Sequence, residues 1–341
     1  MEAAADTVPV ITLTGFLGSG KSTLLNAVLG RSAMPPVAVI VNELGEIPID
    51  HALLENVSEG IALLPSGCVC CAVRSDLEYT LRDLYLKRVR RVIPDFRAVL
   101  LETTGLADPG PVLQTLFSQP ARELRYTAGI VLTTVDCTHA TETLSAYPEA
   151  MRQIAMADRL VLTKSDLSSP HELRTTEDWI DTLNPAAPRI VTTKGNAALD
   201  ELFGTGFPDA MHTESAEMGR WFTAEPHPSH ANTIRTYSYS IPSPLEWERV
   251  HTALKDLLAS HGEHILRAKG LLQIVGIDQP VVLQAVHHTL YPPDLLSGWA
   301  GHPRESRLVV IVDGMERETV DRAVAACSAP GLTSSPRAQL R

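Results

Sequence analysis

Short apolar runs alternate with longer stretches of helical spacing up to about residue 205. The runs are continuously apolar, which is typical of strands covered on both faces, as in a parallel sheet between helices. Helical spacing is clearest from Leu77 to Val89 and from Thr175 to Leu183. The pattern predicts an α/β fold with a doubly wound, mostly parallel sheet. The predicted strands are Val8 to Leu13, Val37 to Val41, Ala98 to Leu101, Gly129 to Val135, Arg159 to Leu162 and Arg189 to Thr192.

A second unit begins at about Thr233, after a stretch rich in Pro, His and Ser that has no sustained apolar period. Strand alternation from Ile234 to Ile241 and an amphipathic stretch from Leu245 to Leu258 predict a smaller α+β domain. Its other predicted elements are strands Ile265 to Ile274, Val281 to His288 and Leu308 to Val312, and a helix near Arg317 to Ala326. We therefore expect domains at 1–206 and 233–328, a linker at 207–232 and a disordered tail at 329–341.

Length, charge and cysteine spacing narrow the set of functions that the chain could have. The chain has 341 residues, enough for two domains with their own cores. Its net charge of −11 would repel a phosphate backbone, so we expect no nucleic-acid partner. The N-terminus lacks the order of a signal peptide, and no stretch approaches the roughly 20 apolar residues of a membrane span. Three of five cysteines lie within four positions, which is unlike a secreted disulfide framework. We expect a cytoplasmic protein without membrane contact.

The first strand and the first helix flank a G-x-x-x-x-G-K-[ST] motif, the pattern of a phosphate-binding loop. Its glycines let backbone amides close around phosphate oxygens, Lys21 reaches the outer phosphates, and Ser22 can hold Mg²⁺. A glycine turn without a ligand is the alternative. The motif predicts a nucleoside triphosphate site formed by Gly15, Gly18, Ser19, Gly20, Lys21, Ser22 and Thr23.

A second loop, after the strand that ends at Leu162, favours GTP over ATP. Asp166 can accept hydrogen bonds from the ring NH and the exocyclic amine of guanine, and the Lys164 stem can lie along the base. Thr163 stands where the commoner motif has Asn. The alternative is that Lys164 and Asp166 are solvated loop charges.

Between these two loops, an apolar strand ends in Glu102 and a glycine turn follows. An acid at this position can hold Mg²⁺ directly or through a water, and the Gly105 amide can sense a γ-phosphate. We therefore assign Lys21, Glu102 and Gly105 to catalysis, with Ser22 and Glu102 as the Mg²⁺ ligands. The alternative for Glu102 is a solvated strand-end acid.

Cys68, Cys70 and Cys71 form a C-x-C-C group. Thiolates are soft ligands, and such a group offers two or three sulfurs to Zn²⁺, Co²⁺ or Cu⁺ while leaving positions open for release. A redox pair, reactive thiols and buried packing residues are the alternatives.

In order and spacing, these motifs resemble the CobW-like family of P-loop GTPase metallochaperones over roughly residues 8–328. The resemblance rests on Gly15 to Thr23, Asn42 to Glu46, Gly67 to Cys71, Glu102 to Gly105, Thr163 to Asp166 and Leu266 to Gly270. It implies GTP hydrolysis coupled to delivery of Zn²⁺, Co²⁺ or Fe²⁺ from the cysteines to a client metalloprotein. It also implies a switch region in which Glu46 or Asp50 supplies oxygen ligands, although both can equally be solvated loop acids.

The resemblance suggests clients such as nitrile hydratase, a cobalamin-pathway enzyme or a zinc-dependent enzyme, and it leaves a homodimer open. We expect a slow intrinsic GTPase.

We expect Arg267 and Lys269 either to bind the partner or to form contacts across the interface between the two domains. The alternative is that both are solvated charges on a strand. Two other functions compete, a GTP-dependent thiol redox sensor and a small-molecule kinase, and the cysteines do not favour the kinase.

Overall fold

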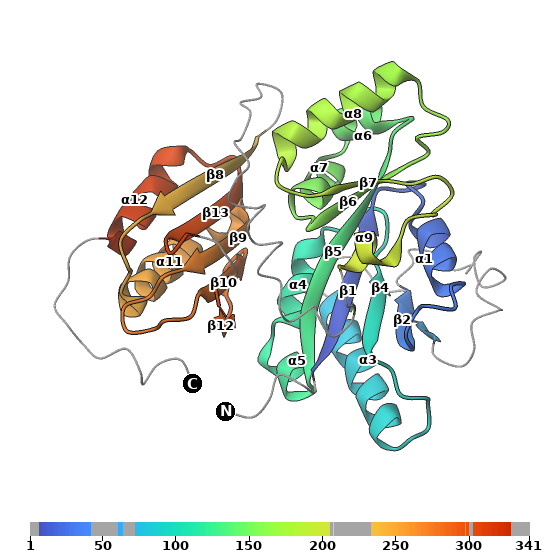
Figure 1. Ribbon diagram of the computed structural model, residues 1–341, viewed down its shortest axis with the longest axis horizontal. Coiled ribbons are helices and arrows are strands. Elements are labelled where there is room, and N and C mark those ends of the chain that lie inside the picture. The colour runs from blue at the N-terminus through green and yellow to red at the C-terminus, as the bar shows by residue number, and fades with distance from the viewer. Residues whose placement is uncertain are drawn as a thin grey trace. The chain divides into compact units, whose positions relative to one another are not determined.

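The computed structural model describes residues 7–41, 61–63, 72–204, 207, 233–296, 298–299 and 303–328, with the backbone alone at 61–63 and 72–75. These residues form two compact units, one around a parallel sheet and one around an antiparallel sheet (Figure 1). Except for Phe207, the predicted linker and the predicted tail lie outside the described residues.

The first unit contains a seven-stranded sheet in the order β3-β2-β4-β1-β5-β6-β7. Every neighbouring pair is parallel, which confirms the predicted α/β sheet. The short strand β3 was not predicted. The strands are β1 Val8–Gly15, β2 Val37–Val41, β3 Ile61–Leu63, β4 Ala98–Glu102, β5 Tyr126–Asp136, β6 Arg159–Thr163 and β7 Arg189–Val191.

Helices cover both faces of this sheet because alternate strand residues point to opposite sides. In β1, Ile11 and Leu13 pack in one core with α1 (Lys21–Leu29) and α9 (Leu199–Phe203). Val8 and Val10 pack in the other core with three further helices. Those helices are α3 Ala72–Val89, α4 Pro109–Leu116 and α5 Gln119–Glu123, and the unit also contains α6 Ala140–Ala146, α7 Pro148–Ala155 and α8 Pro170–Leu183.

The carboxyl ends of the strands meet at one edge of the sheet. Leu13 of β1 pairs with Glu102 of β4, and Glu102 also pairs with Val41 of β2. Val41 in turn pairs with Leu63 of β3. The loops that follow these four strands therefore all leave the sheet at the same edge, where ligands bind in open α/β sheets.

The second unit is an antiparallel sheet in the order β11-β10-β9-β13-β8, with β12 paired to β10. Helices α11 and α12 pack on one face of it, which confirms the predicted α+β fold. Leu254 of α11 and Val320 of α12 share a core with Val310 of β13. The elements are β8 Ile234–Ile241, α11 Trp247–His261, the 3₁₀ helix η3 Gly262–His264, β9 Ile265–Leu272, β10 Val281–Val286, β11 Thr289–Leu290, β12 Asp294–Leu295, β13 Ser306–Asp313 and α12 Arg317–Ser328.

Arg267 and Lys269 on β9 are buried, with 3% and 6% of their surfaces exposed. The alternative that they are solvated strand charges is therefore wrong. In the ranges that the structure describes, no helix combines the length and the apolar character needed to cross a membrane.

The core between α3 and the sheet predicts a contrast within one helix. Leu81 is fully buried there, whereas Leu86 is 38% exposed. Leu81→Ala should lower the free energy of unfolding by about 2–5 kcal/mol, because it leaves a cavity. Leu86→Ala should change it by no more than about 0.5 kcal/mol. Urea unfolding followed by circular dichroism would measure both, and equal losses would contradict the assigned burial.

Candidate functional site

The phosphate-binding loop lies between β1 and α1, where the motif predicts it. Gly15 is the last residue of β1, and Lys21, Ser22 and Thr23 form the first turn of α1. Gly20 caps α1 with φ 93°, a left-handed conformation that favours glycine. No side chain caps the helix, so its first amides are open toward the loop.

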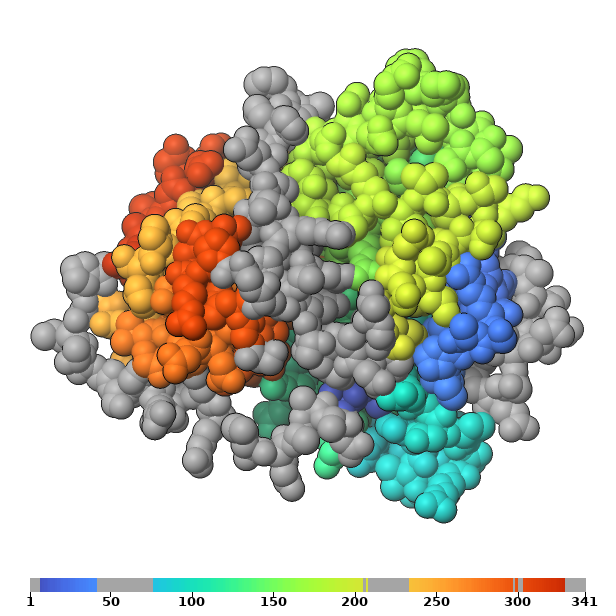
Figure 2. Space-filling view, in the orientation of Figure 1, coloured from blue at the N-terminus to red at the C-terminus, as the bar shows by residue number. Residues whose placement is uncertain are grey.

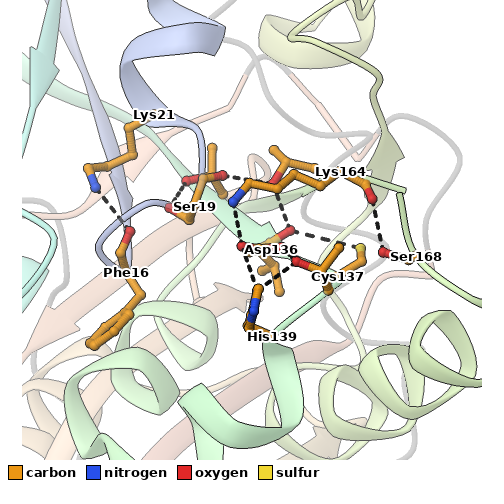
Figure 3. Close-up of polar contacts among 12 residues, drawn as sticks. Phe16, Ser19, Lys21, Asp136, Cys137, His139, Lys164 and Ser168 are labelled. Carbon is orange, nitrogen blue, oxygen red and sulfur yellow. Dashed lines mark hydrogen bonds and ion pairs between the residues drawn. The ribbon is translucent and has the colours of Figure 1, made fainter. Parts of the chain in front are cut away.

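Lys21 is folded back over this loop. Its Nζ donates to the carbonyl oxygen of Gly15 at 2.9 Å and to that of Phe16 at 3.1 Å, the second of which is drawn in Figure 3. The side chain is 9% exposed. Burial lowers the pKa of Lys21, and the Glu102 carboxylate partly opposes that shift. The ammonium group therefore lies within the loop, bound to backbone oxygens that a phosphate oxygen can replace.

Ser22 and Glu102 are in direct contact. The Ser22 hydroxyl donates to Glu102 Oε1 at 2.8 Å, and Glu102 is 6% exposed. The alternative of a solvated strand-end acid is therefore wrong. Adjacent ligands of an octahedral Mg²⁺ with bonds of about 2.1 Å lie about 3 Å apart. The spacing and the oxygen donors of this pair therefore fit two neighbouring positions around Mg²⁺.

Thr163 links the second loop to the first. Its hydroxyl lies 2.7 Å from the carbonyl oxygen of Ser19 and 3.1 Å from that of Val135. The side chain is 6% exposed. One hydroxyl hydrogen can serve only one strong bond at a time, and Ser19 is the nearer acceptor. Thr163, which replaces the commoner Asn, thus joins the end of β6 to the phosphate-binding loop.

Lys164 is held by a residue that the sequence did not reveal. Its Nζ donates to Asp136 Oδ2 at 2.6 Å, at the end of β5 (Figure 3). Burial alone would raise the pKa of Asp136, but hydrogen bonds from Lys164 and Thr138 outweigh it and lower the pKa. Lys164 is therefore not a free solvated charge, whereas Asp166 is exposed. The only feature of the sequence that could have identified Asp136 as a site residue is its position at the end of a predicted strand.

The turn after Glu102 lies against the phosphate-binding loop. A Cβ at Gly105 would be 2.6 Å from the Leu17 nitrogen, so the two backbones touch there. Gln153 of α7, which is 1% exposed, donates from Nε2 to the carbonyl oxygens of Gly105 at 3.2 Å and Ala107 at 2.9 Å. Helix α7 is thereby joined to this turn. The sequence contained no signal for Gln153.

A cavity of about 520 Å³ adjoins the phosphate-binding loop. Residues 16–19, the end of β5 and helices α6 and α7 line it, together with Lys164. Phe16 and Tyr147 contribute a ring pair with centroids 4.5 Å apart. Lys21, Ser22 and Glu102 do not line this space, so it lies beside the groove predicted for the phosphates.

The predicted transition-metal ligands Cys68, Cys70, Cys71 and Glu46 lie outside the described residues. In the part of the chain that is described, no group of three or more His, Cys, Asp or Glu residues could hold a metal ion. The two described cysteines are buried, and burial raises the pKa of each thiol to about 11. Neither is a candidate for thiolate chemistry near neutral pH.

The fold and this loop geometry define a P-loop nucleotide-binding protein with a second domain. The sequence matches the CobW/HypB/UreG nucleotide-binding domain over residues 9–191 and the C-terminal domain of the cobalamin synthesis protein CobW over residues 234–328. The chain belongs to the CobW/HypB/UreG family, which confirms the resemblance inferred from its motifs.

Two relatives and one solved structure extend this assignment. Zinc chaperone YjiA of Escherichia coli is 33% identical over 319 residues, covering 93% of this chain and 98% of the relative. Zinc chaperone CobW of Pseudomonas aeruginosa is 29% identical over 351 residues, covering 92% and 89%. The crystal structure of the Zn(II)-bound YjiA GTPase from E. coli is similar with a TM-score of 0.70 and 27% identity, covering 95% of this chain and all of that one.

The contact between Gly105 and Leu17 yields a prediction. Gly105→Ala should weaken GTP binding about tenfold or more, because the new methyl group displaces the phosphate-binding loop. Gly30→Ala, at the end of α1, is the matched control, since its Cβ would meet only Asn26 O at 3.4 Å. Titration with a fluorescent GTP analogue measures both affinities. Undiminished binding by Gly105→Ala would separate this turn from the nucleotide site.

Proposed function

We propose that this chain is a GTP-hydrolysing metallochaperone that binds Zn²⁺ at Cys68, Cys70 and Cys71 and delivers it to a client metalloprotein under control of the bound nucleotide. GTPase activity and the metallochaperone class are supported by the family and by relatives named zinc chaperones.

The shared edge of the sheet is the observation that carries the proposal. The chain leaves β3 at Leu63, β2 at Val41 and β4 at Glu102, all at one level of the sheet. Neighbouring strands lie about 4.8 Å apart, so Leu63 starts about 10 Å from the acid beside Ser22. The cysteines follow Leu63 within eight residues, and Glu46 follows Val41 within five. Both predicted metal-ligand segments therefore begin beside the nucleotide site.

On the nucleotide side, the open amides of α1 and the loop would bind the phosphates. Lys21 would exchange its two carbonyl acceptors for oxygens of the outer phosphates. Lys164, held by Asp136, would lay its stem along the guanine, and Asp166 would accept from the base. The Gly105 amide would contact the γ-phosphate, and Gln153 would carry its displacement to α7.

Ser22 and Glu102 are the residues that would hold Mg²⁺, since their oxygens fit adjacent positions around that ion. When bound, Mg²⁺ neutralises phosphate charge during phosphoryl transfer. Glu102 has the further role of orienting the attacking water from the end of β4. We expect a slow intrinsic rate that a client can raise.

On the cargo side, thiolates bind Zn²⁺ strongly, and a set of two or three cysteines leaves a position for a client ligand. Glu46 would supply an oxygen from the neighbouring segment. Thiolates also accept Co²⁺, and mixed oxygen and sulfur ligands accept Fe²⁺, so the ligand types alone do not select the metal. We place the protein in the cytoplasm, where such thiols remain reduced.

Coupling follows if nucleotide state changes the segments on which the metal ligands lie. If a nucleotide raises the affinity for Zn²⁺ by some factor, linkage requires that Zn²⁺ raises the affinity for that nucleotide by the same factor. Hydrolysis then lowers Zn²⁺ affinity and favours transfer. We assign this cycle to residues 1–206 and contact with the client to both this domain and residues 233–328.

The coupling can be tested by measuring Zn²⁺ affinity with a competing chelator in three states: without nucleotide, with a non-hydrolysable GTP analogue and with GDP. We expect the analogue to tighten Zn²⁺ binding between about 5-fold and 150-fold relative to GDP. Lys21→Ala should keep Zn²⁺ binding but lose this difference. Replacing Cys68, Cys70 and Cys71 by Ser should abolish tight binding.

Cys327→Ala is the matched control for thiol loss, because Cys327 is a single buried cysteine in the second unit. It should leave both Zn²⁺ affinity and its nucleotide dependence unchanged. Identical Zn²⁺ affinity of the wild-type protein in all three states would refute the coupling, even if GTP hydrolysis and Zn²⁺ binding were both observed.

Base recognition gives a separate prediction. Asp166→Asn should weaken GTP binding roughly 10-fold to 150-fold, because it removes charge-assisted hydrogen bonds worth about 1.5–3 kcal/mol. The same variant should gain affinity for XTP, whose C2 carbonyl can accept from the new amide. Asp200→Asn, an exposed acid on α9, should change neither affinity. Competition of GTP and XTP against a fluorescent analogue measures the exchange, and unchanged preference would remove Asp166 from the base site.

A further inference from the structure

Helix α3 carries apolar residues on two sides, and the structure covers only one of them. Leu77, Leu81 and Leu84 are buried in the core against the sheet. On the other side, Tyr79 is 73% exposed and Val89 is 61% exposed. An amphipathic surface helix normally has a single apolar stripe, so a second stripe indicates a second packing partner.

The exposed side has the spacing of a helix–helix contact. Tyr79, Arg82, Leu86 and Val89 follow one another at intervals of three, four and three residues. All four are exposed, and residues so spaced form one line along a helix, as in a coiled coil. We call these four residues the α3 seam. Val92, 67% exposed, continues the apolar surface just after the helix.

Arginines lie within the seam and just beyond its C-terminal end, on a chain whose net charge is −11. Arg82, Arg90 and Arg91 are exposed, and none makes a side-chain hydrogen bond or ion pair in the described structure. The neighbouring Lys87, by contrast, pairs with Asp83 at 2.7 Å. Three guanidinium groups next to an apolar stripe are therefore available to carboxylates of another molecule.

The end of α3 supports a role for one of these arginines. Arg91 has φ 55°, a left-handed conformation that favours glycine at the end of a helix. The Arg91 amide donates to Arg88 O at 3.0 Å and the Val92 amide to Lys87 O at 2.9 Å, so the turn is the usual helix-ending one. The fold would be served at least as well by glycine here. The guanidinium is the feature that glycine lacks.

We propose that the α3 seam binds an amphipathic helix of a partner protein, with apolar residues packed on Tyr79, Leu86 and Val89 and carboxylates paired with Arg82, Arg90 and Arg91. A second copy of this chain is a poorer occupant. Packing one seam against the same seam would bring two sets of unpaired arginines together, which is repulsive. Charge complementarity therefore selects an acidic partner.

The identity of that partner as the metal-receiving client rests on the proposed function. Helix α3 begins at Ala72, the residue after Cys71, and Tyr79 lies roughly 10 Å further along the helix. The C-terminal end of α3 projects beyond the sheet in Figure 1, and its residues reach the surface in Figure 2 (cyan). A client helix bound to the seam would be anchored to the helix that directly follows the cysteines.

The test uses the full-length protein and two synthetic helical peptides that share one leucine stripe. One peptide carries glutamate beside the stripe and the other carries lysine. By fluorescence anisotropy, the wild-type protein should bind the glutamate peptide at least about tenfold more tightly than the lysine peptide. Leu86→Ser should weaken this binding about tenfold. Val275→Ser, at a residue 46% exposed in the second unit, should not.

Charge reversal provides a result that loss of folding cannot imitate. The double variant Arg82→Glu, Arg90→Glu should bind the glutamate peptide more weakly and the lysine peptide more tightly than the wild-type protein does. Arg174→Glu, at an exposed arginine of α8, should change neither affinity. Failure of the wild-type protein to bind the glutamate peptide, or binding that ignores the arginine reversal, overturns the proposal.

Two other occupants would also overturn it. The first is a wild-type dimer, detected by sedimentation, that Leu86→Ser dissociates. The second is binding to phosphatidylserine vesicles that is lost in the same variants. GTP hydrolysis and Zn²⁺ affinity are measured in parallel and should be unchanged in all seam variants. If the wild-type protein neither hydrolysed GTP nor bound Zn²⁺, the proposed function would be refuted. The peptide experiment would still show whether the α3 seam binds an acidic helix.

Discussion

The candidate site depends on hydroxyl groups that tie the phosphate-binding loop to the ends of neighbouring strands. The Ser19 hydroxyl lies 2.7 Å from that of Thr134 on β5, and Thr163 on β6 reaches the Ser19 carbonyl. On the other side, Thr103 after β4 donates to the hydroxyl of Thr14 at 2.9 Å. Burying a hydroxyl without a hydrogen-bond partner costs free energy, so each of these pairs favours the observed position of the loop or of the strand end that leads into it. The glycine-rich loop is therefore held directly from β5 and β6, and the end of β1 that leads into it is held from the turn after β4, although glycine itself offers no side chain.

Much of the first domain could be predicted because its sheet is parallel. A strand buried on both faces is mostly apolar along its length, so β1, β2, β5 and β6 stood out as nearly continuous apolar runs. Strand β3 and helices α5, α6 and α9 are short, and too few residues repeat in them to show a period. Their positions depend on contacts between distant segments, which a local pattern does not contain.

The motifs indicated a candidate site, but the partners of its residues became visible only in the fold. Ser22 and Glu102 are eighty residues apart, and the parallel pairing of β1 with β4 brings them into contact as expected. Asp136 and Gln153 belong to no motif, and their roles become visible only when β5 and α7 are placed beside the loop. Burial of Arg267 and Lys269 was likewise hidden, because strand alternation does not reveal whether a sheet has a covered second face.

The Lys21 ammonium has two oxygen neighbours inside the protein, the carbonyl groups of Gly15 and Phe16. If Lys21 binds the outer phosphates as proposed, nucleotide binding exchanges the oxygen ligands around one ammonium group. Such an exchange discriminates against single inorganic anions, which must compete with two backbone dipoles and have no base to anchor them.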